Sequence, residues 1–313
     1  MNGASDPVLD AVVAEIPGWS SASLEVVPIA GGITNRNFRV DVHGSSYVVR
    51  LPGEDTALLG IDREAEHQAA VAAAATGVGP EVVAFLPGPG VLVTRFVQGA
   101  SIPVEDLRRP EVLALVVDSI RRFHLCPPIP VTFPVFRIIE GYADLAESRG
   151  VRVPAEYRDA HAVATEIEHA FAAATAPELT CHNDLLNANL LRDGEHVWLV
   201  DFEYAGVGDP WFDLANLSIN NDLDDAACEL LLELSFGEVR DAQRARLGLM
   251  RIVSDLREAM WGVVQQALST LDVDYVGYAR SHLSRCLENA NDRRVPDWLR
   301  EAAADSGWSP AQR

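Results

Sequence analysis

The chain changes character near residue 99, and this change constrains its fold more than any other feature of the sequence. Between residues 24 and 51, three short runs rich in β-branched and aromatic residues are separated by turn residues, which predicts three antiparallel strands. Residues 62–76 combine an acidic first turn with strong helix formers and predict a helix, and two further strands are expected at 81–85 and 91–96.

Beyond Gly99 the sequence is mostly helical in pattern, apart from an interruption at 180–204. Helices are expected near residues 105–124, 155–174, 225–235, 239–268 and 275–290, in addition to a short one at 7–16. The Pro-rich stretch 126–134 is expected to be a connecting loop. The sequence therefore predicts an α+β chain with a small β-rich N-terminal lobe (residues 1–97) and a larger helical lobe (residues 98–313).

Charge and composition exclude several classes of function. The formal net charge is −21, and a chain this acidic is a poor candidate for binding nucleic acid or an anionic membrane. All 25 basic residues are arginine, so no lysine is available for a Walker-type phosphate site, a Schiff base or a Ser/Lys nucleophile pair. Any phosphate chemistry must therefore use arginine, backbone amides and metal.

The cysteine spacing and the start of the chain predict a reducing, cytoplasmic environment. Four cysteines stand far apart with no CxxC pair, which argues against a zinc site or a disulfide framework. The start, MNGASDPVLD, shows no secretory signal, and the apolar runs fall far short of the ~18 residues that a membrane span needs. We expect a reduced, cytoplasmic protein with no nucleic-acid or membrane partner.

Three short patterns carry the chemistry, and their order is informative. Ala30–Asn35 (AGGITN) places paired glycines between two strands, where the backbone can approach phosphates. His182–Asn189 (HNDLLNAN) places an Asp and an Asn five apart on a turn, suited to a base and a metal ligand. Val200–Tyr204 (VDFEY) ends an apolar strand on carboxylates that suit Mg²⁺. Each pattern alone is common in turns, but together they predict phosphoryl transfer.

In this order, the residues GGITNRNF, YVVRL, HNDLLNANLL, VDFEYAG and DPWFDLAN resemble the choline/ethanolamine kinase family, within the protein-kinase-like phosphotransferases. The later segment WGVVQQALSTLDVDYVGYA resembles the part of that family that forms the aminoalcohol pocket. The resemblance extends from about Leu24 to about Leu287. It implies a two-lobed protein-kinase-like fold and the use of ATP and Mg²⁺.

The family's site residues transfer to matching positions. Asp184 would be the catalytic base, assisted by Asn189, while Asn189 and Asp201 would hold Mg²⁺ and Glu203 would support the metal or the substrate. Arg50 stands where many kinases have lysine, and Glu66 would hold it. The residues implied to bind ATP are Gly31, Gly32, Thr34, Asn35, Arg50, Glu66, Arg95, Phe96, Val97, Leu186 and Asp201, with Arg95–Val97 forming the crossover between the lobes.

The acceptor pocket is expected to combine aromatic faces with carboxylates, because cation–π attraction suits a quaternary ammonium. The implied substrate residues are Asp184, Glu203, Trp211, Glu258, Trp261, Tyr275 and Tyr278. The chain departs from the eukaryotic pattern, which has two tryptophans three apart, because Glu258 precedes Trp261 here. If Glu258 faces the pocket, its carboxylate would favour a cation that carries N–H groups.

The leading hypothesis is an ATP- and Mg²⁺-dependent kinase for a small cationic alcohol, with choline first and ethanolamine second. Another cationic acceptor on the same scaffold, such as an aminoglycoside, thiamine or an amino sugar, is an alternative. A catalytically silent nucleotide-binding module is a second one. A homodimer surface is an alternative role for the late aromatic residues.

Overall fold

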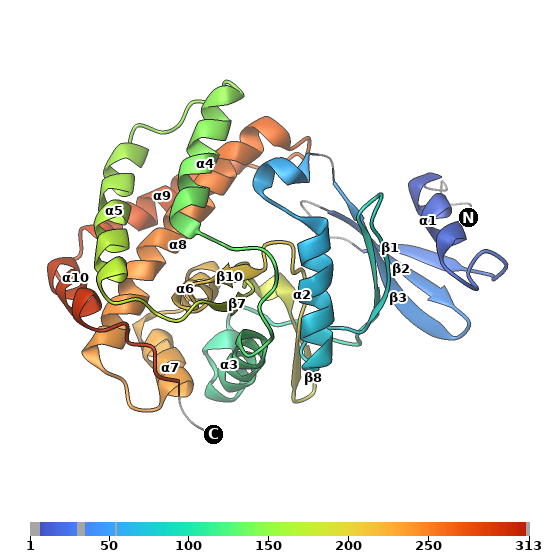
Figure 1. The fold of residues 1–313 in the computed structure, drawn as a ribbon, viewed down its shortest axis with the longest axis horizontal. Helices are drawn as coiled ribbons and strands as arrows, with labels where there is room; N and C mark the ends of the chain where they lie inside the picture. The colour runs from blue at the N-terminus through green and yellow to red at the C-terminus, as the bar shows by residue number, and fades with distance from the viewer. Residues whose placement is uncertain (1–6, 30–34, 54, 311–313) are drawn as a thin grey trace.

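The computed structural model describes residues 7–29, 35–53 and 55–310, and it contains a five-stranded sheet at one end and a mostly helical body at the other (Figure 1). This arrangement confirms the two-lobed, protein-kinase-like α+β fold expected from the sequence. The glycines Gly31 and Gly32 and the neighbouring Thr34, expected to cover the nucleotide phosphates, lie outside the described residues.

The N-terminal sheet is antiparallel with strand order β1-β2-β3-β5-β4. Its strands are β1 (Glu25–Ile29), β2 (Asn35–Val42), β3 (Ser45–Pro52), β4 (Val82–Leu86) and β5 (Val91–Arg95), with bounds close to those predicted. In β3, Val49 and Leu51 are buried in a small core with helix α1 (Pro7–Glu15), so Arg50 between them points to the opposite face. That face is covered by helix α2 (Arg63–Ala75), which begins at the capping residue Asp62.

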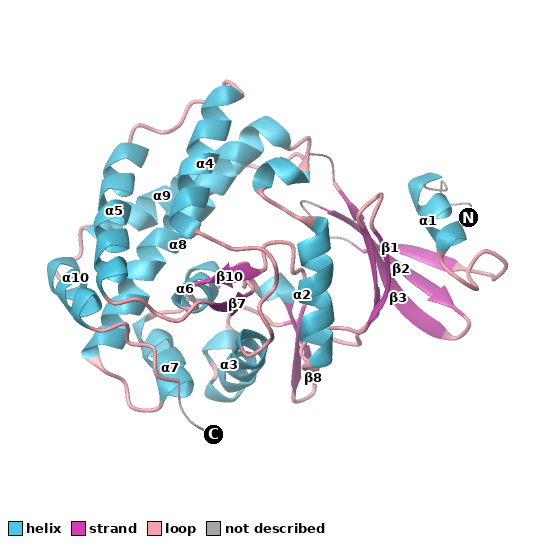
Figure 2. Cartoon of the chain, in the orientation of Figure 1, coloured by secondary structure: helices cyan, strands magenta, loops and turns pink. Residues whose placement is uncertain are grey.

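The helical body contains eight helices among the described residues after residue 99 (Figure 2). The eight are the α-helices α3 (Pro110–His124), α4 (Val135–Ser148), α5 (Tyr157–Ala173), α6 (Trp211–Asn220), α7 (Asp225–Phe236), α8 (Asp241–Leu268), α9 (Tyr275–Ala290) and α10 (Val295–Ala304). A short 3₁₀ turn, η2 (Asp106–Arg108), precedes α3. The sequence missed α4, α6 and α10. Helix α6 is buried on nearly every side, so it lacks the polar face on which periodicity depends.

Two small sheets hold the segments that the sequence singled out. Strands β7 (Leu179–Cys181) and β10 (Gly206–Gly208) pair with each other, and β6 (Ala100–Ser101), β8 (Leu190–Asp193) and β9 (His196–Leu199) form the second sheet. The loop before β8, which includes the 3₁₀ turn η3 (Asn187–Asn189), and the segment after β9 are thereby brought side by side. A further 3₁₀ turn, η1 (Thr56–Leu59), precedes α2.

Two expectations about the whole chain can be compared with the fold. All four cysteines are buried with free thiols. In the described part of the chain, no helix combines the length and apolarity that crossing a membrane would require.

Two helical glycines provide a test of the packing. A Cβ added to Gly248 of α8 would lie 2.8 Å from the Trp298 ring of α10, whereas a Cβ on Gly141 of α4 would meet nothing within 4 Å. We expect Gly248→Ala to destabilise the protein by about 1–2 kcal/mol through overpacking. Gly141→Ala should instead stabilise it by up to about 1 kcal/mol through helix propensity. Urea unfolding of both variants checks this, and equal effects would contradict the packing of α10 on α8.

Candidate active site

Two cavities meet at the junction of the sheet and the helical body. The first, of about 390 Å³, lies under the sheet and is lined by Arg50, the crossover Arg95–Val97 and the segment after β9. The second, of about 460 Å³, lies in the helical body. Both cavities are lined by Ala188, Asn189 and Asp201. A chemical group transferred from one cavity to the other must therefore pass these residues.

Arg50 joins the sheet, α2 and the segment after β9. One of its terminal nitrogens donates to Glu66 of α2, and the same nitrogen lies 2.7 Å from Asp201 Oδ1. Although burial disfavours its charge, the carboxylates of Asp201 and Glu66 raise the pKa of the Arg50 guanidinium above its usual range. The structure therefore brings together the Arg50, Glu66 and Asp201 side chains that the sequence singled out.

A second arginine, Arg63 of α2, was missed by the sequence analysis. Its NH1 lies 2.6 Å from Glu66 Oε2 and 3.3 Å from Glu203 Oε2, and its NH2 donates to Asn35 Oδ1 at 2.9 Å. Asn35 Nδ2 in turn donates to Glu203 Oε2 at 2.8 Å. Asn35, expected to touch the nucleotide, lines neither cavity and instead binds Glu203.

The loop that carries Asp184 is held in place by buried polar groups. Asp213 of α6 accepts hydrogen bonds from the backbone amides of His182 at 2.9 Å and Asn183 at 2.7 Å, and His124 lies 2.8 Å from the same carboxylate. Asn183 has a φ of 64°, in the left-handed region that Asn tolerates better than most residues. His182 contacts the Val200 carbonyl at 3.0 Å and so helps to fix the loop, and burial lowers its pKa.

Asp184 and Asn189 are in direct contact. The Asn189 side-chain amide nitrogen donates to Asp184 Oδ2 at 3.0 Å and to the Asp184 backbone carbonyl at 2.9 Å. Burial raises the pKa of the Asp184 carboxyl well above its usual value of 3.8, and nearby carboxylates add to this. Asp184 forms no ion pair with any residue in the described part of the chain.

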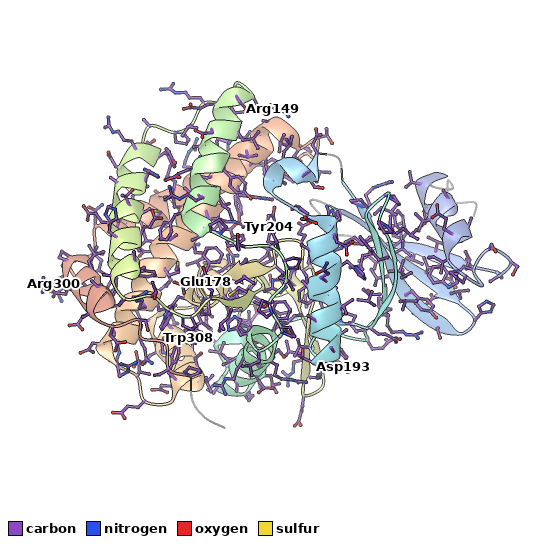
Figure 3. All side chains as sticks on the ribbon, in the orientation of Figure 1. Arg149, Glu178, Asp193, Tyr204, Arg300 and Trp308 are labelled. Atoms are coloured by element: carbon purple, nitrogen blue, oxygen red, sulfur yellow. The ribbon has the colours of Figure 1, made fainter. Side chains whose placement is uncertain are left out.

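Aromatic side chains from α8, α9 and the segment after β9 line the second cavity. Trp261 Nε1 donates to the Tyr204 hydroxyl at 3.0 Å, and the Trp261 ring contacts the rings of Tyr275 and Tyr278 edge-on at 6.0 and 5.6 Å between centroids. Figure 3 shows Tyr204 in the interior of the molecule. Because Trp261 and Tyr275 are buried and line a cavity, the structure does not support a dimer surface at these residues.

Glu258 also faces this cavity, but its oxygens already have donors. Arg257 lies 2.8 Å from Oε1, Asn216 donates to Oε1 at 3.1 Å and the Tyr278 hydroxyl donates to Oε2 at 2.9 Å. Burial disfavours the charged carboxylate, yet Arg257, His282 and the Tyr278 hydroxyl together lower the pKa of Glu258. Arg257 is itself buried, with its guanidinium 4.4 Å from the centre of the Tyr204 ring.

Of the five carboxylates that line the second cavity, four are paired with arginine. The pairs are Asp201 with Arg50 at 2.7 Å, Glu203 with Arg63 at 3.3 Å, Glu258 with Arg257 at 2.8 Å, and Asp222 with Arg285 at 3.0 Å. Asp184 is the fifth and has no such partner among the described residues. Its carboxylate is therefore the one best able to accept a proton or a hydrogen bond from a ligand in this cavity.

Two sequence expectations are corrected by these positions. Trp211 is fully buried in the core, where it packs on Phe236 and Trp308 and its Nε1 donates to the Ser306 carbonyl at 2.9 Å, so it does not line the second cavity. Leu186, expected at the nucleotide, lines the second cavity and not the first. In addition to Arg63, the sequence missed Tyr204, Asp222, Arg257 and Arg285 as cavity residues.

The donor atoms at the junction suit a hard cation such as Mg²⁺. Asp201 supplies a carboxylate and Asn189 an amide, and because the Asn189 nitrogen donates to Asp184, its oxygen is left for another partner. One cluster of possible metal ligands among the described residues, His124, Cys181 and Asp213, is fully buried. There, however, Asp213 already holds the loop described above, so we assign it a structural role.

Comparisons with known proteins agree with this geometry. The model of the family described as "Phosphotransferase enzyme family" matches residues 25–247. A choline/ethanolamine kinase family protein from Mesorhizobium loti is 31% identical in sequence, with a TM-score of 0.83, and the match covers 95% of this chain and 98% of that one.

Two curated relatives are more distant. Protein LicA of Haemophilus influenzae is 28% identical over 205 residues, which cover 65% of this chain and 60% of LicA. Ethanolamine kinase 2 of Rattus norvegicus is 25% identical over 296 residues, which cover 84% of this chain and 75% of that protein.

Proposed function

Because the chain belongs to the choline/ethanolamine kinase family of phosphotransferases, we propose that it transfers the γ-phosphate of ATP, with Mg²⁺, to the hydroxyl of a small amino alcohol. Choline is the proposed first acceptor and ethanolamine the second. The observation that carries the proposal is the Asp184 carboxylate, which has no ion-pair partner among the described residues and faces an aromatic cavity where that cavity meets the cleft under the sheet.

In this proposal the nucleotide occupies the first cavity, between the lobe formed by residues 1–97 and the segments next to β8 and β9. The backbone amides of Arg95 and Phe96 donate to the Glu81 and Ser46 carbonyls, at 2.8 and 3.0 Å, so Val97 is the next crossover amide for the adenine. Arg50 would position the phosphates, because its guanidinium is fixed by Glu66 and lines this cavity.

Asn189 and Asp201 would hold Mg²⁺ at the junction, with Glu203 in support. When bound there, a divalent cation neutralises charge on the transferring phosphate. Asp184 would accept a hydrogen bond from the acceptor hydroxyl, orient its oxygen toward the first cavity and take its proton during transfer. Burial, which raises the pKa of Asp184, makes it a stronger base than an exposed carboxylate.

The acceptor would occupy the second cavity, in the lobe formed by residues 98–313. A primary ammonium needs hydrogen-bond acceptors for its N–H groups, whereas a quaternary ammonium is satisfied by aromatic faces. Glu258 could have served a primary ammonium, but Arg257, Asn216 and Tyr278 occupy its oxygens. Trp261, Tyr275 and Tyr278 therefore favour choline over ethanolamine.

Two alternatives remain distinct from this proposal. The size of the second cavity is also compatible with a larger cationic acceptor, such as an aminoglycoside, thiamine or an amino sugar. A silent nucleotide-binding module would bind ATP without acceptor-dependent release of ADP. Against it stands the presence of all five expected site residues: Arg50 contacts Glu66 and Asp201, and Asn189 contacts Asp184.

The role of Asp184 is tested by Asp184→Asn, which preserves shape but removes the base. We expect choline-dependent ADP release to fall about 10²–10⁴-fold, because a positioned base contributes that much, while the dissociation constant for ATP stays nearly unchanged. Asp222→Asn is the matched control, since Asp222 lines the same cavity but is paired with Arg285. An Asp184→Asn variant as active as the control would refute the proposed mechanism.

The aromatic pocket is tested by Trp261→Leu. We expect the KM for choline to rise about tenfold, the effect of losing a desolvated cation–π contact, and the KM for ATP to remain at its wild-type value. The wild type should also show a higher kcat/KM for choline than for ethanolamine. Trp198→Leu serves as the control because Trp198, on β9, lines neither cavity. An unchanged KM for choline in Trp261→Leu would refute this assignment of the pocket.

A further inference from the structure

Arg63 occupies a central place between the lobes without touching either cavity. It is the first residue of α2, and its guanidinium contacts side chains from four segments of the chain. These contacts are Glu66 Oε2 at 2.6 Å, Glu203 Oε2 at 3.3 Å, Asn35 Oδ1 at 2.9 Å and Thr56 Oγ1 at 3.0 Å. Because Arg63 lines neither cavity, any effect on the reaction must pass through these partners.

Glu66 connects Arg63 to the arginine that faces the nucleotide cavity. Its Oε1 accepts from Arg50 and its Oε2 from Arg63. Arg50 then reaches Asp201 and Arg63 reaches Glu203, the two carboxylates that flank Phe202. The two arginines thus form parallel bridges from α2 to the segment after β9, both dependent on one glutamate.

The network is well shielded from water. The exposed fraction of the side chain is 14% for Arg63, and 3% each for Glu66 and Glu203. Removing one partner from such a group leaves a buried charge uncompensated, which favours rearrangement of the remaining partners. A planar guanidinium can serve several acceptors in fixed directions, whereas an uncharged amide of similar length cannot.

We propose that Arg63 is a positioning residue for phosphoryl transfer. It holds Asn35 at the start of β2, Glu203 after β9 and Glu66 of α2 in one arrangement. Arg50 and Asp201 thereby keep the relative positions that phosphoryl transfer requires. This inference rests on the proposed function only in taking the first cavity to bind ATP.

Arg63→Gln tests the proposal through the kinetics of ADP release. We expect kcat to fall at least about tenfold, because small misplacements at a reacting centre are costly. The KM for choline should stay within about twofold of the wild type, because losing the Arg63 contacts weakens stabilisation of the transition state and not binding of the acceptor. A simple loss of folded protein would lower the apparent kcat as well, so the melting temperature is measured in parallel.

Thr56→Val supplies a second variant that acts only through Arg63. Thr56 is buried, its hydroxyl accepts from Arg63, and valine has nearly the same shape. We expect kcat to fall about threefold in the wild-type background and to change no further in the Arg63→Gln background. Such non-additivity is the signature of residues that act in one network.

Arg121→Gln is the matched control for losing a hydrogen-bonded arginine. Arg121 of α3 donates to the Leu234 and Ser235 carbonyls at 3.2 and 3.1 Å and lines neither cavity. Its loss should lower the melting temperature and leave kcat unchanged.

A folded Arg63→Gln variant with wild-type kcat, or a Thr56→Val effect that persists without Arg63, would overturn the proposal. If Arg63→Gln does not fold, Thr56→Val decides alone: a threefold lower kcat at the wild-type melting temperature supports the proposal, and an unchanged kcat overturns it. A wild type that does not turn over choline would contradict the proposed function only. The same fold-changes are then measured on ATP hydrolysis without an acceptor.

Discussion

A carboxylate buried between two lobes is costly unless a cation lies beside it, and this constraint shapes the whole site. The chain has 46 acidic residues and no lysine, so arginine must supply nearly all of the compensation. Among the described residues, it does so at four of the five carboxylates that line the second cavity. The fifth, Asp184, is held by hydrogen bonds from Asn189 instead, and this leaves it free for chemistry.

The same pairing determines what the cavity can recognise. Glu258 carries a charge next to the aromatic residues, but Arg257 neutralises it and the Tyr278 hydroxyl occupies its second oxygen. Its function is then to orient Tyr278 and so to shape the pocket. In the function proposed above, a cation would be recognised mainly by the ring faces, which do not distinguish their ligands by N–H groups. A pocket of this kind suits a quaternary amine.

The sequence predicted the parts of the site that depend on local patterns. Asp184, Asn189 and Asp201 lie in short motifs, and both lobes follow from the change of pattern near residue 99. It could not predict Arg63 or Arg257, whose importance arises from contacts with residues such as Glu203, 140 positions away from Arg63. Trp211 shows the converse error: the family resemblance suggested a pocket residue, but Trp308, which follows α10, packs against it and makes it core. Figure 3 shows Trp308 close to α7.

The central claim is that, within the described part of the chain, Asp184 is the one carboxylate of this cavity without an arginine partner. A carbon-13 NMR titration of the side-chain carboxyls tests it most directly. The Asp184 signal, identified by its loss in Asp184→Asn, should titrate well above 3.8, because burial disfavours its charged form. The Glu258 signal should titrate below its ordinary value of 4.5, because Arg257 favours the charged form. An Asp184 carboxyl that titrates at or below 3.8 would contradict the account, since it would require a cation beside Asp184.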